Sequence, residues 1–252
     1  MAFIEKVEWR MLNKINEIIG LVNQQVKEIQ EMKKTLAENK LKIDLLADFS
    51  GTKSQILQDL FVLKYLRHKT GGYFVEFGAL DGLTHSNTYL LEKKYGWSGI
   101  LVEPARSCHE LLRQNRNAII DTRCVWSHSN LSLDFSEVYA VAHSTITAFK
   151  DSDFHSKIRS NSRNYSVETV SLLDLLKQHN APSLIDYLSI DTEGSEFEIL
   201  NSFDFSLYKF KAITCEHNFT DNRSKIFDLL VRFGYKRIYT DQTSCDDWYV
   251  LE

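Results

Sequence analysis

Residues 73–82, YFVEFGALDG, join a short apolar segment to a turn with two glycines. The first five residues are aromatic or β-branched except Glu76, which predicts a buried β-strand. Gly78 and Gly82 bracket a tight turn before a predicted helix over 84–94. A strand, a glycine turn and a helix in this order open the ligand-binding unit of Rossmann-like sheets. The stretch therefore predicts an α/β domain whose ligand lies at this turn.

The charge of the turn indicates which ligand it binds. A dinucleotide site uses GxGxxG, so that bare backbone N–H groups meet the pyrophosphate. Here Asp81 stands between the glycines and Glu76 lies just before them. Two carboxylates repel a diphosphate and attract a cation, which disfavours a nicotinamide dehydrogenase. A cofactor with an ammonium and a sulfonium group, such as S-adenosylmethionine, suits this charge; the alternative is a structural glycine turn with solvated acids.

The composition is that of an ordinary soluble protein with one α/β domain and an appendage. The chain has 252 residues, of which 43% are hydrophobic and 25% charged. A formal charge of −4 without a basic stripe gives no argument for a nucleic-acid partner, and Lys157, Arg159 and Arg163 are interpreted as a solvated loop. Four scattered cysteines without a CxxC pair predict reduced thiols in a cytoplasmic protein. Charges interspersed at the amino terminus predict neither a signal peptide nor a membrane span.

Residues 1–48 contain no proline, and their apolar positions follow a heptad. Position a holds Ile4, Met11, Ile18, Gln25, Met32, Asn39 and Leu46, and position d holds Glu8, Ile15, Val22, Ile29, Leu36 and Ile43. We expect a coiled-coil oligomerisation helix over 1–48 and a Rossmann-like domain over 49–252. Because several d residues are β-branched, a trimer is favoured over a parallel dimer. The alternative is an amphipathic helix folded back on its own domain.

A second strand is predicted over 97–103, WSGILVE, and it ends in an acid. In nucleotide-binding sheets an acid about 20 residues beyond the glycine turn accepts hydrogen bonds from ribose hydroxyls, so Glu103 is the expected ribose ligand. A third strand is predicted over 118–126. Its last residues, Val125 and Trp126, are candidates for the edge and face of an adenine, and a core position is the alternative for the tryptophan.

Small polar side chains begin the helix predicted after the glycine turn. Free N–H groups at a helix start favour an anion, so Ser86 and Asn87 are expected to bind a cofactor carboxylate. Plain N-capping is the alternative.

An insertion is predicted between the third and later strands. Residues 131–148 alternate apolar and polar side chains, which predicts a hairpin or extra strands, and a polar loop follows over 150–165. This segment is placed to cover the cofactor and shape an acceptor pocket. Tyr139 and His143 are pocket candidates, with packing as the alternative.

Two further strands end in polar clusters. The segment SLIDYLSIDTEG, 183–194, ends in Asp191 and Glu193, and the strand over 212–215 is followed by Glu216, His217 and Asn218. Because the carboxyl ends of parallel strands meet at one edge of a sheet, these side chains are expected at the ligand site.

Two chemical uses of this edge remain open. Asp191, Glu216 and Asn218 could bind a divalent cation that lowers the pKa of an acceptor hydroxyl. Alternatively, His217 or Asp191 acts directly as the general base on that hydroxyl.

The assembled motifs resemble the FkbM-type family of S-adenosylmethionine-dependent methyltransferases. The resemblance rests on SQILQD at 54–59, FVEFGALDGLTHSNTYLLEKKYGWSGILVEP at 74–104, IDTEGSEFEIL at 190–200, and Glu216. It does not cover the heptad region, and it departs at Leu57, where similar chains often have glycine. It implies a mostly parallel seven-stranded sheet with helices on both faces. It also implies cofactor binding by Glu76, Gly78, Asp81, Ser86 and Glu103, with Asp191 by the reacting centre.

The function expected from this resemblance is O-methylation of a sugar or glycan hydroxyl. The glycan could be a bacterial surface polysaccharide, with peripheral association of the enzyme at a glycan assembly complex. The main alternative is a catalytically silent interaction or scaffold module on a coiled coil. Acids at three strand ends argue against it, because a silent domain has no physical need for them.

Overall fold

The computed structural model describes the backbone of residues 2–252 and the side chains of residues 14, 16–36, 39–40, 43–44 and 46–252. The chain divides into two compact units, one ending at Gly51 and one beginning at Thr52. Among the described residues, no helix combines the length and the apolar character that a bilayer span requires.

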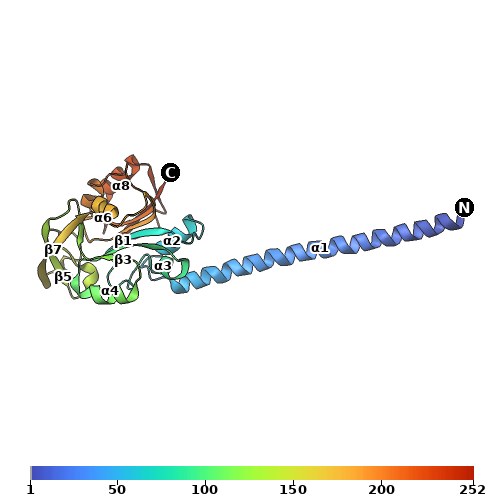
Figure 1. The fold of residues 1–252 in the computed structure, drawn as a ribbon, viewed down its shortest axis with the longest axis horizontal. Helices are drawn as coiled ribbons and strands as arrows, with labels where there is room; N and C mark the ends of the chain where they lie inside the picture. The colour runs from blue at the N-terminus through green and yellow to red at the C-terminus, as the bar shows by residue number, and fades with distance from the viewer. Residues whose placement is uncertain (1) are drawn as a thin grey trace. The chain divides into compact units, whose positions relative to one another are not determined.

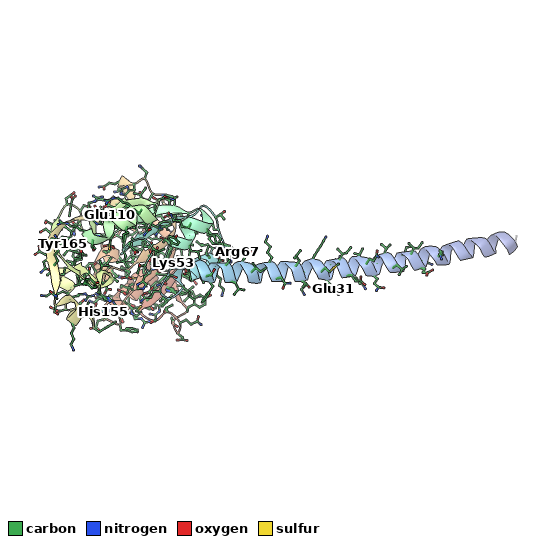
Figure 2. The ribbon with its side chains drawn as sticks, turned by 90° about the horizontal axis from the view of Figure 1, so that it is seen from below. Glu31, Lys53, Arg67, Glu110, His155 and Tyr165 are labelled. Carbon is green, nitrogen blue, oxygen red and sulfur yellow. The ribbon has the colours of Figure 1, made fainter. Side chains whose placement is uncertain are left out.

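The first unit is a single helix, α1 (Ala2–Gly51), which continues three residues past the predicted boundary at 48 (Figure 1). Its described side chains stand out around the helix (Figure 2). The apolar heptad side chains that the structure describes are exposed: Ile18, Val22, Ile29, Met32, Leu36, Ile43 and Leu46. The predicted heptad residues Ile4, Glu8, Met11 and Ile15 lie outside the described side chains. The helix therefore carries an apolar seam that its own unit does not bury.

The second unit is built on a seven-stranded sheet with the order β10-β11-β9-β8-β1-β2-β3. Its strands are β1 (Tyr73–Phe77), β2 (Ser98–Val102), β3 (Ile119–Asp121), β8 (Leu184–Ile190), β9 (Lys209–Glu216), β10 (Tyr235–Ile238) and β11 (Asp246–Leu251). Neighbouring strands from β3 to β9 are parallel, and β11 runs antiparallel to both of its neighbours. The predicted mostly parallel, seven-stranded sheet is confirmed.

Helices cover both faces of this sheet, as predicted (Figure 1). One face packs against α6 (Leu172–Gln178), α7 (Glu196–Asn201) and α8 (Asn222–Arg232), and the other against α2 (Gln58–Tyr65), α3 (Tyr89–Tyr95) and α4 (His109–Asn115). Side chains alternate along β1, so Val75 and Phe77 enter the first core and Phe74 the second. The carboxyl ends of the parallel strands are thereby left free for a ligand.

A smaller sheet, ordered β4-β7-β5-β6, adjoins these strand ends. It contains β4 (Cys124–Trp126), β5 (Ser132–Val138), β6 (Thr145–Ile146) and β7 (Ser162–Ser171), with the short helical turns η2 (Val141–His143) and η3 (Thr147–Phe149) and helix α5 (Ser156–Arg159) between them. A third such turn, η1 (Arg106–Cys108), precedes α4. The extra strands predicted over 131–148 are present, and we call residues 131–165 the insertion. The single strand predicted over 118–126 is wrong: β3 and β4 belong to different sheets.

Two helices begin later than their sequence suggests. Helix α2 begins at Gln58, directly after Leu57, which has a left-handed backbone (φ 68°). Glycine adopts this conformation freely, which gives a physical reason for glycine at this position in similar chains. Helix α3 begins at Tyr89 rather than Thr84, so Ser86 and Asn87 lie in a loop before it.

Candidate active site

A cavity of about 440 Å³ opens at the carboxyl ends of β1, β2, β8 and β9, and the insertion supplies part of its wall. This volume lies in the range of small-molecule sites. Ten predicted site residues line it: Glu76, Gly78, Asn87, Glu103, Val125, His143, Asp191, Glu193, Glu216 and Asn218. Five others do not: Asp81, Ser86, Trp126, Tyr139 and His217. The strand-end pattern therefore located the cavity better than it assigned individual contacts.

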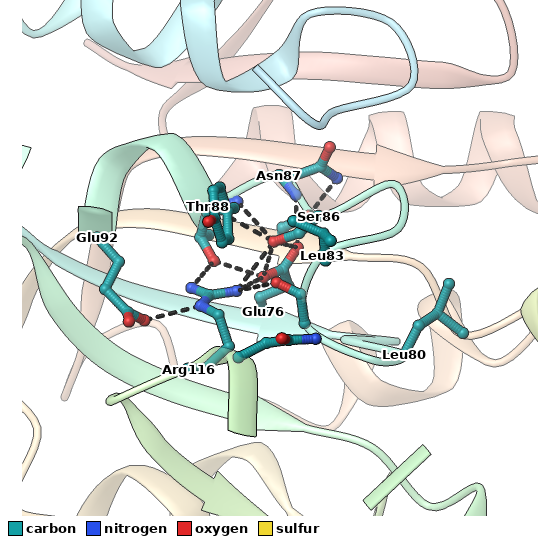
Figure 3. A network of polar contacts seen from close by, with 12 residues as sticks. Glu76, Leu80, Leu83, Ser86, Asn87, Thr88, Glu92 and Arg116 are labelled. Atoms are coloured by element: carbon teal, nitrogen blue, oxygen red, sulfur yellow. Dashed lines mark hydrogen bonds and ion pairs between the residues drawn. The ribbon is translucent and has the colours of Figure 1, made fainter. Parts of the chain in front are cut away.

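Glu76 is held by a buried polar network (Figure 3). Its carboxylate accepts hydrogen bonds from Ser86 Oγ, from the backbone N–H of Asn87 (2.6 Å) and from Thr88 Oγ1. The guanidinium of Arg116, whose side chain is fully buried, lies 3.6 Å away and also pairs with Glu92 at 2.8 Å. The charge of Glu76 is therefore offset inside the protein, and the carboxylate fixes the loop that leads to α3.

Asp81 has a similar local role. Its carboxylate accepts hydrogen bonds from the backbone N–H groups of Leu83 (2.9 Å) and Thr84 (2.7 Å) and from the hydroxyl of Thr84 (2.9 Å). An aspartate that bonds to the N–H groups two and three residues ahead stabilises a turn. The side chain thus closes the glycine turn on itself and is not part of the cavity wall.

Gly78 brings β1 and β8 together at the edge of the cavity. Its backbone has φ 75°, and a Cβ atom there would lie 2.2 Å from the carbonyl oxygen of Asp191. Only glycine fits both the conformation and the contact. The turn after β1 can therefore lie directly against the end of β8, where the acids gather.

Glu103 lies at the end of β2 and lines the cavity. Its two oxygens accept hydrogen bonds from the backbone N–H groups of Leu80 (2.8 Å) and Ala105 (2.7 Å), which fix its orientation. Burial raises the pKa of Glu103 to about 7 although these bonds favour the charged form. Val125 lies on the cavity wall as predicted, whereas Trp126 packs edge-on against Phe149 at a centroid distance of 5.9 Å.

Three carboxylates gather at the ends of β8 and β9. Oxygen atoms of Asp191, Glu193 and Glu216 lie within 4.8 Å of one another. Burial, and next the neighbouring carboxylates, raise the pKa of both Asp191 and Glu216 well above the usual range. The amide nitrogen of Asn218 donates to Glu216 (2.8 Å) and to Glu193 (3.2 Å).

Two of the three predicted cation ligands, Asp191 and Glu216, lie in this group, and Glu193 supplies a third carboxylate. The side chain of Asn218 turns a donor toward the acids instead of a third oxygen ligand. Glu193 accepts hydrogen bonds from the Asn218 amide and from the guanidinium of Arg159. A proton held by Asp191 or Glu216 lowers the repulsion between these two carboxyl groups. Glu193 is therefore the carboxylate of this cluster that the chain's own groups balance.

His217 lies outside the cavity, although its two neighbours in the sequence, Glu216 and Asn218, line it. Its Nδ1 accepts a hydrogen bond from the N–H of Phe219, and its Nε2 lies 3.8 Å from Asp247. Burial lowers the pKa of this imidazole. Of the two predicted general bases, the geometry leaves only Asp191 on the cavity wall.

The insertion contributes one residue whose role the sequence did not reveal and one pocket residue that it predicted. Arg159, expected in a solvated loop, has a fully buried side chain that pairs with Glu193 (2.6 Å) and Asp153 (2.9 Å). This loop interpretation was wrong for Arg159, because the two acids supply the partners that make burial of the cation tolerable. His143 lines the cavity, as predicted, and lies 3.3 Å from Glu193. The alternation of residues 131–148 indicated strands, but no signal linked Arg159 to the IDTEG segment.

Comparisons with known proteins place this fold and site in a family. No curated protein matches the chain. Among solved structures, an O-methyltransferase from Bacillus cereus in complex with SAH is 13% identical, covering 85% of this chain and 90% of that one, with a TM-score of 0.44. A precorrin-6y C5,15-methyltransferase from Geobacter metallireducens is 12% identical, covering 81% and 93%, with a TM-score of 0.39. The family model for the methyltransferase FkbM domain matches residues 76–237, and the chain therefore belongs to the FkbM methyltransferase family.

Proposed function

We propose that this methyltransferase binds S-adenosylmethionine in the cavity at the strand ends and methylates a hydroxyl group of a sugar or glycan. The observation that carries the proposal is the charge of the wall. Glu103 lies on one side, and Asp191, Glu193 and Glu216 on another. Such a wall favours a cofactor with an ammonium and a sulfonium group over a diphosphate.

The residues present fit this cofactor. Glu103 is oriented by two backbone N–H groups and can accept hydrogen bonds from ribose hydroxyls, and Val125 offers an apolar contact for the adenine. Gly78 leaves room for close approach to its backbone, since it has no Cβ. When bound, S-adenosylmethionine supplies a methyl group on a positively charged sulfur. The protein then has to orient the acceptor hydroxyl and take up its proton.

Two exposed aromatic side chains on the cavity wall support a sugar acceptor. Phe154 and Phe219 are 64% and 65% exposed and both line the cavity. An exposed aromatic face beside carboxylates suits a ring with an apolar face and several hydroxyl donors. We extend the proposal to a bacterial surface glycan, methylated in the cytoplasm by an enzyme peripherally associated with the assembly complex.

Calorimetric titration with S-adenosylmethionine and with NAD tests the cofactor. We expect binding of the first alone; binding of neither supports the scaffold alternative, and binding of NAD alone contradicts the proposal. Incubation of candidate glycans with isotopically labelled cofactor, followed by mass spectrometry, then tests the acceptor. Label on nitrogen or carbon instead of a hydroxyl oxygen would contradict O-methylation.

We also propose that α1 self-associates as a coiled coil, with a trimer favoured over a dimer. The support is the seam of seven exposed apolar heptad residues on one uninterrupted helix. Sedimentation should give a multiple of the monomer mass for the full chain and the monomer mass for residues 52–252. Equal monomeric masses would contradict self-association.

A further inference from the structure

We propose that His143, oriented by Glu193, is the general base that removes the proton from the acceptor hydroxyl. The inference rests on the proposed O-methylation and assigns its proton acceptor. His143 lies in η2 of the insertion and lines the cavity, and its Nδ1 is 3.3 Å from Oε1 of Glu193. An N–H at Nδ1 that donates to the carboxylate leaves the lone pair of Nε2 available as the proton acceptor.

Two hydrogen bonds and burial fix the orientation of the Glu193 carboxylate, which a residue that positions a base requires. Its Oε2 accepts a hydrogen bond from the guanidinium of Arg159 at 2.6 Å and another from the amide of Asn218 at 3.2 Å. The side chain is almost fully buried, and its backbone has φ 58°, a conformation that costs energy outside glycine. The carboxylate is thus held in one orientation, with Oε1 directed at the imidazole.

Contacts from the insertion hold His143 in its turn. The carbonyl oxygen of His143 accepts a hydrogen bond from Nε of Arg159 at 2.7 Å. The hydroxyl of Thr145 donates to the carbonyl oxygen of Glu193 at 2.9 Å. Hydrogen bonds from Arg159 and Thr145 therefore connect the η2 segment to the turn after β8, next to the His143–Glu193 pair. A base oriented by a second group, itself oriented by a third, is the arrangement that general-base catalysis requires.

His155 completes the surroundings of the base. Its ring stacks on that of His143, with centroids 4.0 Å apart and planes inclined by 19°. Two adjacent imidazolium rings would repel each other, and burial, followed by His143, lowers the pKa of His155. The charged or titratable groups around His143 are thus Glu193, His155 and Arg159, with Asp153 beyond the arginine.

The other candidate bases are less suitable. Asp191 is half-buried beside the buried carboxyl group of Glu216, and each charge disfavours the other. His217 is outside the cavity. His143 is the cavity-lining imidazole that has a carboxylate partner among the residues the structure describes.

The proposed step balances as a displacement. The acceptor O–H bond breaks, and its proton moves to Nε2 of His143. The oxygen forms a bond to the methyl carbon while the bond from that carbon to the sulfonium sulfur breaks. The electron pair stays on sulfur, which leaves S-adenosylhomocysteine, and the imidazolium is stabilised by Glu193 until it releases the proton to water.

The test compares the full-length wild-type protein with His143→Gln, Glu193→Gln and a matched control, His128→Gln, whose imidazole lies outside the cavity. With labelled S-adenosylmethionine and a panel of nucleotide sugars and oligosaccharides, we expect His143→Gln to lower kcat about 10²–10⁴-fold. Affinity for the cofactor, measured by calorimetry, should stay within threefold, and the acidic limb of the pH profile should disappear. The control should match the wild type.

A second readout does not depend on the acceptor. NMR of the His143 ring nitrogens should show the tautomer with its proton on Nδ1 in the wild type and a smaller share of it in Glu193→Gln, because a neutral amide is a weaker acceptor than a carboxylate. A kcat for His143→Gln within threefold of the wild type, or unchanged tautomer populations in Glu193→Gln, would overturn the assignment. Loss of cofactor affinity in His143→Gln would also overturn it, placing this residue in the cofactor site. A wild-type protein that binds the cofactor but methylates no hydroxyl contradicts the proposed function instead.

Discussion

Replacing Arg116 by methionine removes the cation on which the buried network beside the cavity depends. The side chain of Arg116 is fully buried and lies 2.8 Å from Glu92 and 3.6 Å from Glu76. It also donates to the hydroxyl oxygens of Ser86 (3.0 Å) and Thr88 (2.8 Å). Methionine keeps most of the length and apolar contact of the arginine, but it leaves Glu76 without its cation and Glu92 with Lys93 alone, at 3.0 Å.

The expected cost is large because a buried charge loses its partner. Breaking a buried ion pair from one side costs about 3–5 kcal/mol, and here two carboxylates are affected. A single domain has about 5–15 kcal/mol of stability in total. We therefore expect Arg116→Met to lower the free energy of unfolding by about 4 kcal/mol. The variant should also bind S-adenosylmethionine more weakly, because Glu76 no longer holds the loop that carries Asn87.

Urea unfolding followed by tryptophan fluorescence measures this change. Arg113→Met is the matched control, because Arg113 is exposed on α4 and makes one long hydrogen bond, to the carbonyl of His109 at 3.4 Å. The free energy of unfolding of the control should lie within about 0.5 kcal/mol of the wild-type value. Adding Glu76→Gln to Arg116→Met should recover part of the loss, since one unpaired charge disappears. A loss below about 1 kcal/mol in Arg116→Met would refute the view that Glu76 is neutralised inside the protein.

Three further changes test other parts of the site. Gly78→Ala should lower the free energy of unfolding, measured in urea, by about 3 kcal/mol or more, because its Cβ would lie 2.2 Å from a backbone oxygen. The control Gly96→Ala, which has a positive φ but open space around the Cβ, should lower it by about 1 kcal/mol. The raised pKa of Glu103, about 7 against 4.5 unfolded, means that the folded state retains a proton that the unfolded chain releases. The free energy of unfolding should therefore fall by about 3 kcal/mol between pH 4.5 and 7, and Glu103→Gln should remove this slope. Exhaustive chelation should leave methyl transfer within twofold of the untreated protein, and loss of transfer restored by one divalent cation would instead support a cation at Asp191, Glu193 and Glu216.

Local sequence patterns were enough to predict four strands of the central sheet. Short apolar segments bounded by glycine or acidic residues correspond to β1, β2, β8 and β9. Because parallel strands end at one edge, the pattern also brought Glu103, Asp191 and Glu216 to one cavity. Helix starts were less predictable: the left-handed backbone of Leu57 delays α2, and no residue preference would suggest it for leucine.

Buried cations were the main feature that the sequence concealed. Arg116 lies between two asparagines and Arg159 lies in the polar segment 155–164, yet both side chains are fully buried. Their partners, Glu76 and Glu193, are far away along the chain and meet them only after the sheet and the insertion have formed. Asp81, by contrast, could have been interpreted correctly, because an aspartate followed by glycine in a turn commonly bonds to the N–H groups just ahead.

These pairings change which acids can select a cationic cofactor. The sequence suggested Glu76 and Asp81, but the first is paired with Arg116 and the second is bonded within its own turn. Glu103 has no cationic partner among its described contacts: it accepts two backbone hydrogen bonds and lines the cavity. A nearby sulfonium would lower the raised pKa values of Asp191 and Glu216 and so favour their ionised forms. Preference for a cation over a diphosphate should therefore reside in the strand ends of β2, β8 and β9, and only indirectly in the glycine turn.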